Sequence, residues 1–171
     1  MSNNAAGVEL INVQANYGNA FVGIVNQDTD IPIVLNTTSK IKSFQLKVKL
    51  PERINLVGDL TEAVLPYNEN ISLEVSQSQD GSLTISGTAA EALETGKNIL
   101  LNIKVKTSWQ NTYPIKLSNI SLTTPNGETK SIPDSETSLV MQGVRGDMNG
   151  DGRVDLSDAL YIINLATGLA E

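Results

Sequence analysis

The 171-residue sequence contains no cysteine and no histidine. Without cysteine the chain has no disulfide, no thiolate chemistry and no zinc–thiolate site. Without either residue type, and without a Gly-x-Ser-x-Gly motif, the usual pairs of nucleophile and base are missing. The lack of disulfides still allows secretion, because a chain of this length can bury a sufficient core without covalent staples.

Aromatic residues, long apolar runs and excess positive charge are also scarce. Aromatic residues make up 4% of the sequence, and the formal net charge is −7. No apolar run approaches the roughly 20 residues that cross a bilayer as a helix. Negative charge disfavours nucleic acid and anionic membranes as partners. We therefore expect no nucleic-acid partner and no membrane insertion.

The most specific motif is an acidic loop at residues 147–158, Asp-Met-Asn-Gly-Asp-Gly-Arg-Val-Asp-Leu-Ser-Asp. It places acidic or amide oxygens at loop positions 1, 3, 5, 9 and 12 and Gly152 at position 6, the pattern of a calcium loop. Two ordinary solvated turns would explain the Asn-Gly and Asp-Gly pairs but not the five oxygen positions. The expected Ca²⁺ ligands are Asp147, Asn149, Asp151, the backbone carbonyl of Arg153, Asp155 directly or through a water, and Asp158.

A short helix is expected after this loop, from Asp158 to Thr167, because the segment has apolar residues at helical spacing and no Gly or Pro. Ser157 or Asp158 would cap its start, and Gly168 would end it. The segment before the loop is too short and too interrupted by Gly to form a matching entering helix. The apolar face formed by Leu160, Ile163 and Leu165 is expected to pack either on the preceding domain or on another chain.

Residues 146–160 closely resemble one repeat of a dockerin, the calcium-dependent module that docks secreted polysaccharide-degrading enzymes onto cohesins. Aspartate at loop position 12 fits this family better than it fits calmodulin-like proteins. Dockerins carry two such repeats, and this sequence contains one. By the resemblance, Leu156 and Ser157 at loop positions 10 and 11 contribute to partner choice, and Leu160 and Ile163 are further candidates for interaction.

Short alternating segments separated by turn signals fill residues 8–142, a pattern typical of a β-sandwich. The alternation of apolar and lysine residues is clearest in Phe44–Leu50 and Leu100–Lys106. Only Ala89–Glu94 suggests a helical turn. The expected strands are Val8–Ala15, Ala20–Val25, Ile31–Asn36, Ile41–Leu50, Ile71–Ser76, Ser82–Gly87, Asn98–Thr107, Tyr113–Thr123, Thr129–Ile132 and Ser138–Gln142.

The order of these segments is similar to that of a cohesin, a jelly-roll sandwich. The early strands of the resemblance are Ile31–Asn36, Ile41–Pro51 and Ile54–Gly58, and the later ones are Leu83–Ala89, Gly96–Lys106 and Tyr113–Leu122. The expected fold is therefore all-β: a nine- or ten-stranded jelly-roll-like β-sandwich, similar to cohesins and carbohydrate-binding modules, followed by a short calcium loop and helix.

Three parts are expected along the chain: a flexible leader at 1–7, a cohesin-like β-sandwich at 8–142 and a single dockerin-like repeat at 143–171. The resemblances imply a non-catalytic, calcium-binding module for protein–protein assembly in extracellular polysaccharide degradation, as in cellulosome-related proteins. The implied location is extracellular, secreted or attached to a bacterial or archaeal cell surface. The implied partner is a protein of cohesin or dockerin type or the chain's own sandwich, with a homo-oligomer as a further alternative.

The alternative function is carbohydrate binding, with a polysaccharide as the ligand. Sugars usually stack on exposed aromatic rings, and Trp109 and Tyr113 are the candidates here. Packing of Trp109 over the end of the core is the simpler interpretation. Catalysis by paired carboxylates such as Asp59 with Glu62, or Glu91 with Glu94, is disfavoured because acids near turns are usually ordinary solvated surface.

Overall fold

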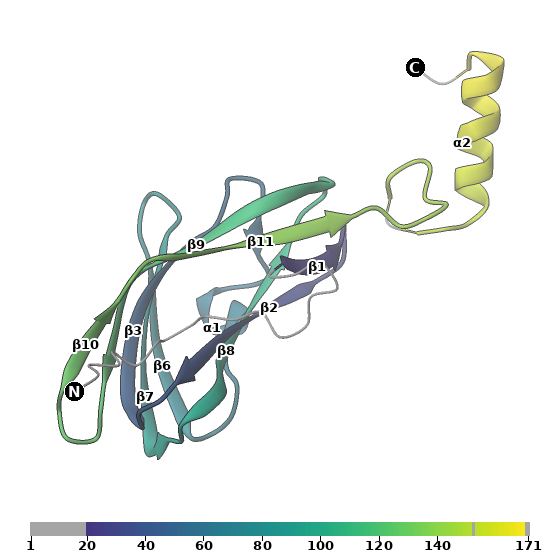
Figure 1. The fold of residues 1–171 in the computed structure, drawn as a ribbon. Coiled ribbons are helices and arrows are strands. Elements are labelled where there is room, and N and C mark those ends of the chain that lie inside the picture. The colour runs from purple at the N-terminus through teal and green to yellow at the C-terminus, as the bar shows by residue number, and fades with distance from the viewer. Residues whose placement is uncertain (1–19, 152, 170–171) are drawn as a thin grey trace.

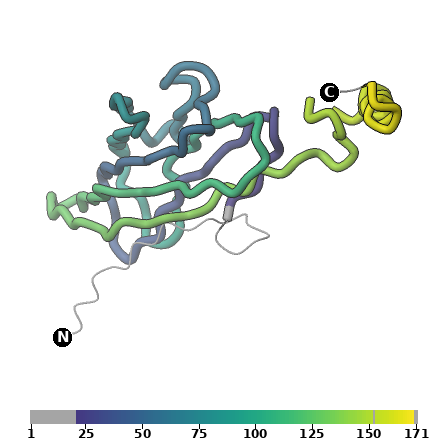
Figure 2. The backbone as a smooth tube through the Cα atoms, turned by 90° about the horizontal axis from the view of Figure 1, so that it is seen from above, coloured from purple at the N-terminus to yellow at the C-terminus, as the bar shows by residue number. Residues whose placement is uncertain are grey.

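The structure, a computed structural model, describes residues 20–151 and 153–169. Two β-sheets form a sandwich, and a loop and helix extend from one end of it (Figures 1 and 2). The larger sheet contains, in spatial order, β1 (Ala20–Ile24), β11 (Ser135–Gln142), β9 (Asn111–Thr123), β3 (Ile41–Lys49), β7 (Leu83–Leu93) and β6 (Ile71–Gln77), and β10 (Thr129–Ile132) pairs with β9. The smaller sheet contains β2 (Thr29–Thr37), β8 (Gly96–Lys106) and β4 (Asn55–Leu56), and β5 (Val64–Pro66) pairs with β8.

The expected all-β sandwich is confirmed, and its core follows the alternation of the strands. In β3, Phe44, Leu46 and Val48 are buried, whereas Gln45 and Lys49 are exposed. β8 buries Ile103 and Val105 in the same way from the other sheet. Because successive side chains of a strand point to opposite faces, each sheet turns one apolar face inward and one polar face to water.

The two ends of the described sandwich lie side by side. β1 pairs in parallel with β11, from Ala20 with Ser138 to Ile24 with Gln142. β11 also pairs antiparallel with β9, so it is held on both sides. This double pairing fixes the point at which the chain leaves the sandwich for the acidic loop.

The helical turn expected at Ala89–Glu94 is wrong, because this segment continues β7 as far as Leu93. Ala89 pairs with Ile71 of β6, and Leu93 pairs with Ile41 of β3, so tertiary pairing overrides the helix propensity of Ala and Glu. A short helix, α1 (Leu60–Ala63), was not expected. It begins with a capping box in which the Asp59 carboxylate accepts from the amides of Thr61 and Glu62.

The expected leader at 1–7 and the expected strand Val8–Ala15 lie outside the described residues. Within the described residues, no helix is long and apolar enough to cross a membrane.

Gly87 leaves room for the ring of Phe44 in the larger sheet, and we expect a larger residue at this position to destabilise the protein. This glycine pairs with Phe44, and a Cβ atom added at Gly87 would overlap the buried Phe44 ring. Gly87→Ala should therefore lower the free energy of unfolding by about 1–3 kcal/mol, as overpacking does, although alanine suits a strand better than glycine. Denaturant unfolding of Gly87→Ala, Phe44→Leu and the double variant measures this. A Gly87→Ala cost that is equally large in the Phe44→Leu background would show that the ring is not the cause.

Candidate metal loop and interaction surfaces

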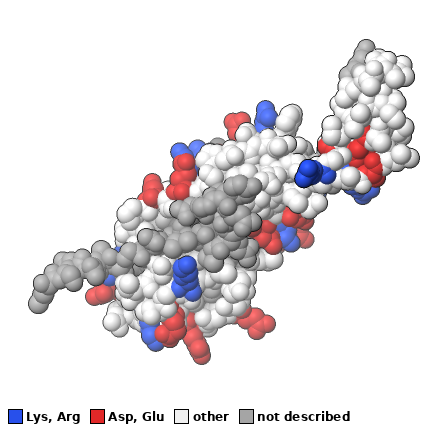
Figure 3. All heavy atoms as spheres, turned by 45° about the vertical axis from the view of Figure 1, so that its right-hand side comes forward, with Lys and Arg blue, Asp and Glu red and all other residues white. Residues whose placement is uncertain are grey.

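The acidic loop and the following helix form an arm that projects from the sandwich (Figures 1 and 2). We use "arm" for residues 143–169, which comprise the acidic loop at 147–158 and α2 (Leu156–Thr167). Acidic side chains gather at the base of the arm, and α2 beyond them is free of charge (Figure 3). The charged and apolar parts of the arm are thus separate in space.

Side-chain oxygens of the loop fold its first half by accepting hydrogen bonds from backbone amides. Asp147 Oδ1 accepts from the amides of Gly150 at 2.7 Å and Asp151 at 3.1 Å. Asn149 Oδ1 accepts from the Asp151 amide at 3.0 Å, and Asp151 Oδ1 accepts from the Arg153 amide at 2.8 Å. These short-range bonds explain why Asp and Asn suit this turn-rich segment.

The carboxylate of Asp158 closes the loop. Asp158 is only 4% exposed; its Oδ1 accepts from the Met148 amide at 2.7 Å and its Oδ2 from the Asp155 amide at 2.8 Å. The bond from the Asp155 amide is the main cause that lowers the pKa of Asp158, and the amides of Met148 and Asn149 add to it. Asp158 therefore stays ionised at neutral pH and joins the two ends of the loop.

Asp155, rather than Ser157 or Asp158, is the N-cap of α2, which corrects the expected start of the helix. Asp155 Oδ1 accepts from the Ser157 amide at 2.8 Å and from the Ser157 hydroxyl at 2.6 Å, and the hydroxyl bond is the main cause that lowers the pKa of Asp155. The carboxylate of Asp158, the third helical residue, accepts in return from the backbone amide of Asp155, so the two residues form a complete capping box. The expected termination at Gly168 is confirmed, with φ of 71° in the left-handed region.

The chemistry of the loop suits a hard cation, because its donors are carboxylate, amide and carbonyl oxygens. Asp158, at position 12, already lies against the start of the loop through the amides of Met148 and Asn149. Among the described residues, however, no three acidic side chains converge closely enough to form a ready-made metal site. Gly152, at position 6, lies outside the described residues. A cation would thus have to exchange some bonds to loop amides for its own coordination.

The apolar side chains of α2 are uncovered in the described part of the chain. Leu160, Ile163 and Leu165 are 50%, 54% and 51% exposed, and Asp158 is the only residue of α2 that is buried. The expected alternative in which this face packs on the chain's own sandwich is therefore wrong for the described residues: the helix stands away from both sheets (Figures 1 and 2). The loop leads the chain away from the sandwich before the helix begins, so the apolar face does not contact the core in this structure.

Asn26 links the sandwich to the acidic loop, a role that the sequence did not reveal. Its side-chain Nδ2 donates to the Gly150 carbonyl at 3.0 Å, and its own amide donates to the Thr107 carbonyl at 2.8 Å. Asn26 has a positive φ of 61°, a conformation that Asn tolerates better than most residues. The sequence signal at this position was an Asn in a turn directly after a strand. It could not identify the partner, because Gly150 lies 124 positions away along the chain.

Trp109 and Tyr113, the candidate sugar-stacking residues, do not share one surface. Trp109 is 58% exposed, so it does not pack over the core, and the Arg53 guanidinium lies 4.5 Å from the centre of its ring. Tyr113 is only 4% exposed, and its hydroxyl donates to the Trp109 carbonyl at 2.9 Å. The burial of Tyr113 leaves the Trp109 ring as the only one of the two that a ligand can reach.

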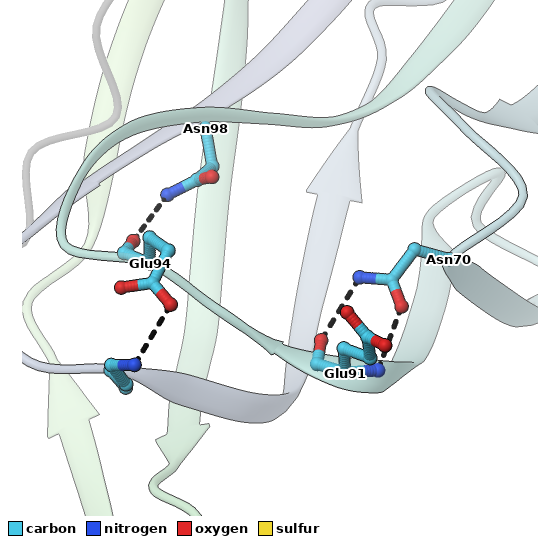
Figure 4. A network of polar contacts seen from close by, with 5 residues as sticks. Asn70, Glu91, Glu94 and Asn98 are labelled. Atoms are coloured by element: carbon cyan, nitrogen blue, oxygen red, sulfur yellow. Dashed lines mark hydrogen bonds and ion pairs between the residues drawn. The ribbon is translucent and has the colours of Figure 1, made fainter.

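The acidic pairs considered for catalysis have structural partners. Asp59 and Glu62 form the capping box of α1, and hydrogen bonds from Thr61, above all from its hydroxyl, lower the pKa of Asp59. In the second pair, the backbone of Glu91 exchanges two hydrogen bonds with the Asn70 side chain (Figure 4). Glu94 forms an ion pair with Lys40 at 2.8 Å. The first pair thus caps the start of α1, whereas in the second pair Glu91, near the end of β7, uses its backbone rather than its carboxylate in the two bonds.

Replacing Asn26 should loosen the arm. Asn26→Asp keeps the shape and the tolerance of positive φ but sets an acceptor against the Gly150 carbonyl, so we expect faster local motion of the α2 amides in ¹⁵N relaxation. The melting temperature of the sandwich should change little, because the bond lies on its surface. Gln27→Ala, at the exposed next position, is the control. Unchanged relaxation in Asn26→Asp would mean that the bond does not restrain the arm.

Comparison with known proteins gives matches at the level of structure alone. No family model and no curated protein sequence matches the chain. A cohesin module from a family 33 glycoside hydrolase of Clostridium perfringens superposes with a TM-score of 0.60 at 10% identity, over 81% of this chain and 96% of the module. A non-cellulosomal cohesin from the archaeon Archaeoglobus fulgidus gives 0.58 at 14% identity, over 72% and 86%.

A third match was solved together with a partner. The sixth cohesin of scaffoldin B from Acetivibrio cellulolyticus, in complex with the Cel5 dockerin, superposes with a TM-score of 0.57 at 9% identity, over 72% of this chain and 94% of the cohesin. At such low identities the likeness concerns the backbone alone. The described β-sandwich of this chain therefore has a cohesin-like fold.

Proposed function

We propose that this protein is a non-catalytic, calcium-binding assembly module that acts outside the cell in polysaccharide breakdown. Its sandwich would bind a protein partner of cohesin or dockerin type, and its arm would bind Ca²⁺. The observation that carries the proposal is the joining, in one chain, of a cohesin-like sandwich and an acidic loop with calcium-type spacing. The cohesin of the Acetivibrio cellulolyticus complex, which has the same fold, is bound to a dockerin.

Calcium would be held by Asp147, Asn149, Asp151, Asp155, Asp158 and the carbonyl of Arg153. The ion would neutralise the gathered negative charge and cross-link the loop. Asp158 supports this role, because its buried carboxylate already connects the loop's second residue with its ninth. Millimolar extracellular calcium suits a loop that is this exposed.

The outer face of the larger sheet would be the polar docking surface for the partner. Two rows of side chains cross it: Glu74, Ser86, Gln45 and Ser121 form one, and Ser76, Thr84, Lys47 and Ser118 form the other. In β3 and β7 the neighbours of these residues along the strand are buried, as are those of Ser121 in β9, so these side chains face away from the core. In β6, Glu74 and Ser76 are exposed and alternate with half-buried Leu73 and Val75. Hydroxyl, amide and charged groups spread over a rigid sheet support recognition by many hydrogen bonds without a deep pocket.

Carbohydrate binding remains the second candidate, and the exposure of Trp109 is what favours it. Arg53 lies over one face of the ring, so a sugar would stack on the opposite face. On a glycan array, this function would give signals that disappear in Trp109→Ala. If the array gives no signal and the chain captures a protein partner, the assembly function is favoured instead.

Calcium should order the arm and leave the sandwich nearly unchanged, because few contacts join the two. Titration calorimetry should show binding of one ion per chain, and hydrogen exchange of the loop and α2 amides should slow when calcium is added, as for any ligand held only by the folded state. Asp147→Ala and Asp158→Ala should abolish both effects. Asp134→Ala removes an exposed acid of the β10–β11 turn and should change neither. Calcium that binds the two loop variants as tightly as the wild type would contradict this site.

Docking through the larger sheet should be sensitive to bulk and charge at its centre. We expect at least one member of a panel of calcium-loaded, two-repeat dockerins to bind the chain in surface plasmon resonance. Ser86→Arg should weaken that binding by about tenfold or more, since a buried unpaired charge is costly at an interface. Asn102→Arg, on a strand of the smaller sheet, is the matched control. Binding that is lost in Asn102→Arg and kept in Ser86→Arg would place the docking surface on the other sheet.

A further inference from the structure

We propose that α2 is a self-association surface, on which the α2 helix of a second copy of this chain packs antiparallel about a two-fold axis near Leu160. The inference concerns the arm and does not depend on partner docking by the sandwich. It starts from a row of three apolar side chains, Leu156, Leu160 and Ile163, which are 74%, 50% and 54% exposed. Their spacing of four and three residues places them on one side of the helix, as in the contact seam of paired helices.

Charge favours an identical helix as the occupant. Asp158 is the only charged residue in α2, and its carboxylate is buried among the loop amides. The exposed surface of α2 is therefore uncharged, which agrees with the white surface of this helix in Figure 3. Such a surface has no charge pattern to select a different partner, and it meets a copy of itself without like-charge repulsion. Apolar side chains of both copies would leave water together.

Geometry favours the antiparallel arrangement. The arm projects from the sandwich, and the sandwich lies at the N-terminal end of α2 (Figures 1 and 2). Two antiparallel helices therefore place the two sandwiches at opposite ends of the pair, where they do not collide. In this arrangement Leu156 of each copy faces Ile163 of the other, and Leu160 faces its own equivalent. A two-fold contact of this kind is closed, so assembly ends at the dimer.

The contact is large enough for a weak dimer. α2 has 12 residues, which corresponds to a length of about 18 Å at the rise of an α-helix. Two such helices, each about 10 Å wide, bury on the order of several hundred Å² in total when they lie side by side, which is below the roughly 1,000 Å² of stable interfaces and in the range of weak contacts. The dimer is therefore expected to depend on protein concentration in the micromolar range and to strengthen when calcium orders the arm.

Sedimentation equilibrium of the full chain in calcium tests the dimer. The apparent mass should rise with concentration from 18.3 kDa toward twice that value and no further. Leu160→Asp, at the axis, should raise the dimer dissociation constant at least tenfold. Ile162→Asp is the matched control, since Ile162 is similarly exposed at 46% but points to another side of the helix. Because both variants place Asp inside α2, far-UV circular dichroism checks that they lose equal helicity.

Thiol cross-linking tests the register directly. The chain has no cysteine, so Leu160→Cys introduces a single thiol at the proposed axis. Mild oxidation should convert it into a covalent dimer, whereas Ile162→Cys should stay monomeric. A chain that is monomeric at all concentrations, a dimer that survives Leu160→Asp, or oligomers larger than two would each overturn the proposal. None of these outcomes bears on dockerin binding by the sandwich, so the two proposals fail independently.

Discussion

The hydrogen bonds of the Asp158 carboxylate hold the arm together. One oxygen accepts from the amide of Met148 and the other from the amide of Asp155, so a single buried side chain joins the beginning of the loop to the start of α2. The same side chain completes the capping box of the helix. Loop closure and helix initiation thus depend on one ionised group, whose pKa these amides keep below its ordinary value.

The sandwich supplies a rigid base for this arm. Parallel pairing of β1 with β11 places the beginning of the described chain beside the strand that leads into the loop. Asn26, in the turn after β1, then reaches the loop through the Gly150 carbonyl. Within the described residues, the arm is attached by the covalent chain after Gln142 and is further linked by the side-chain hydrogen bond of Asn26. An attachment of this size orients the loop without burying the helix.

The molecule presents two surfaces of opposite character. The outer face of the larger sheet carries hydroxyl, amide and charged groups, whereas the exposed surface of α2 is uncharged and largely apolar. A polar sheet gains specificity from directional hydrogen bonds, and an apolar helix gains affinity from the removal of water. The first surface is the one proposed for a docking partner, and the second is the one proposed for contact with a second copy of the chain.

Local rules of the sequence predicted much of this protein. Alternation of apolar and polar residues located β3 and β8, because a strand with one buried face must alternate. Oxygen spacing located the acidic loop, and Gly168 located the end of α2, because each depends only on nearby residues. Tertiary structure decided what rests on distant partners: pairing with β6 and β3 kept Ala89–Glu94 out of a helix. Three further features also depend on how segments far apart in the sequence meet: the burial of Tyr113, the bond between Asn26 and Gly150, and the projection of α2 away from the core. Periodicity and spacing along the sequence do not encode such meetings.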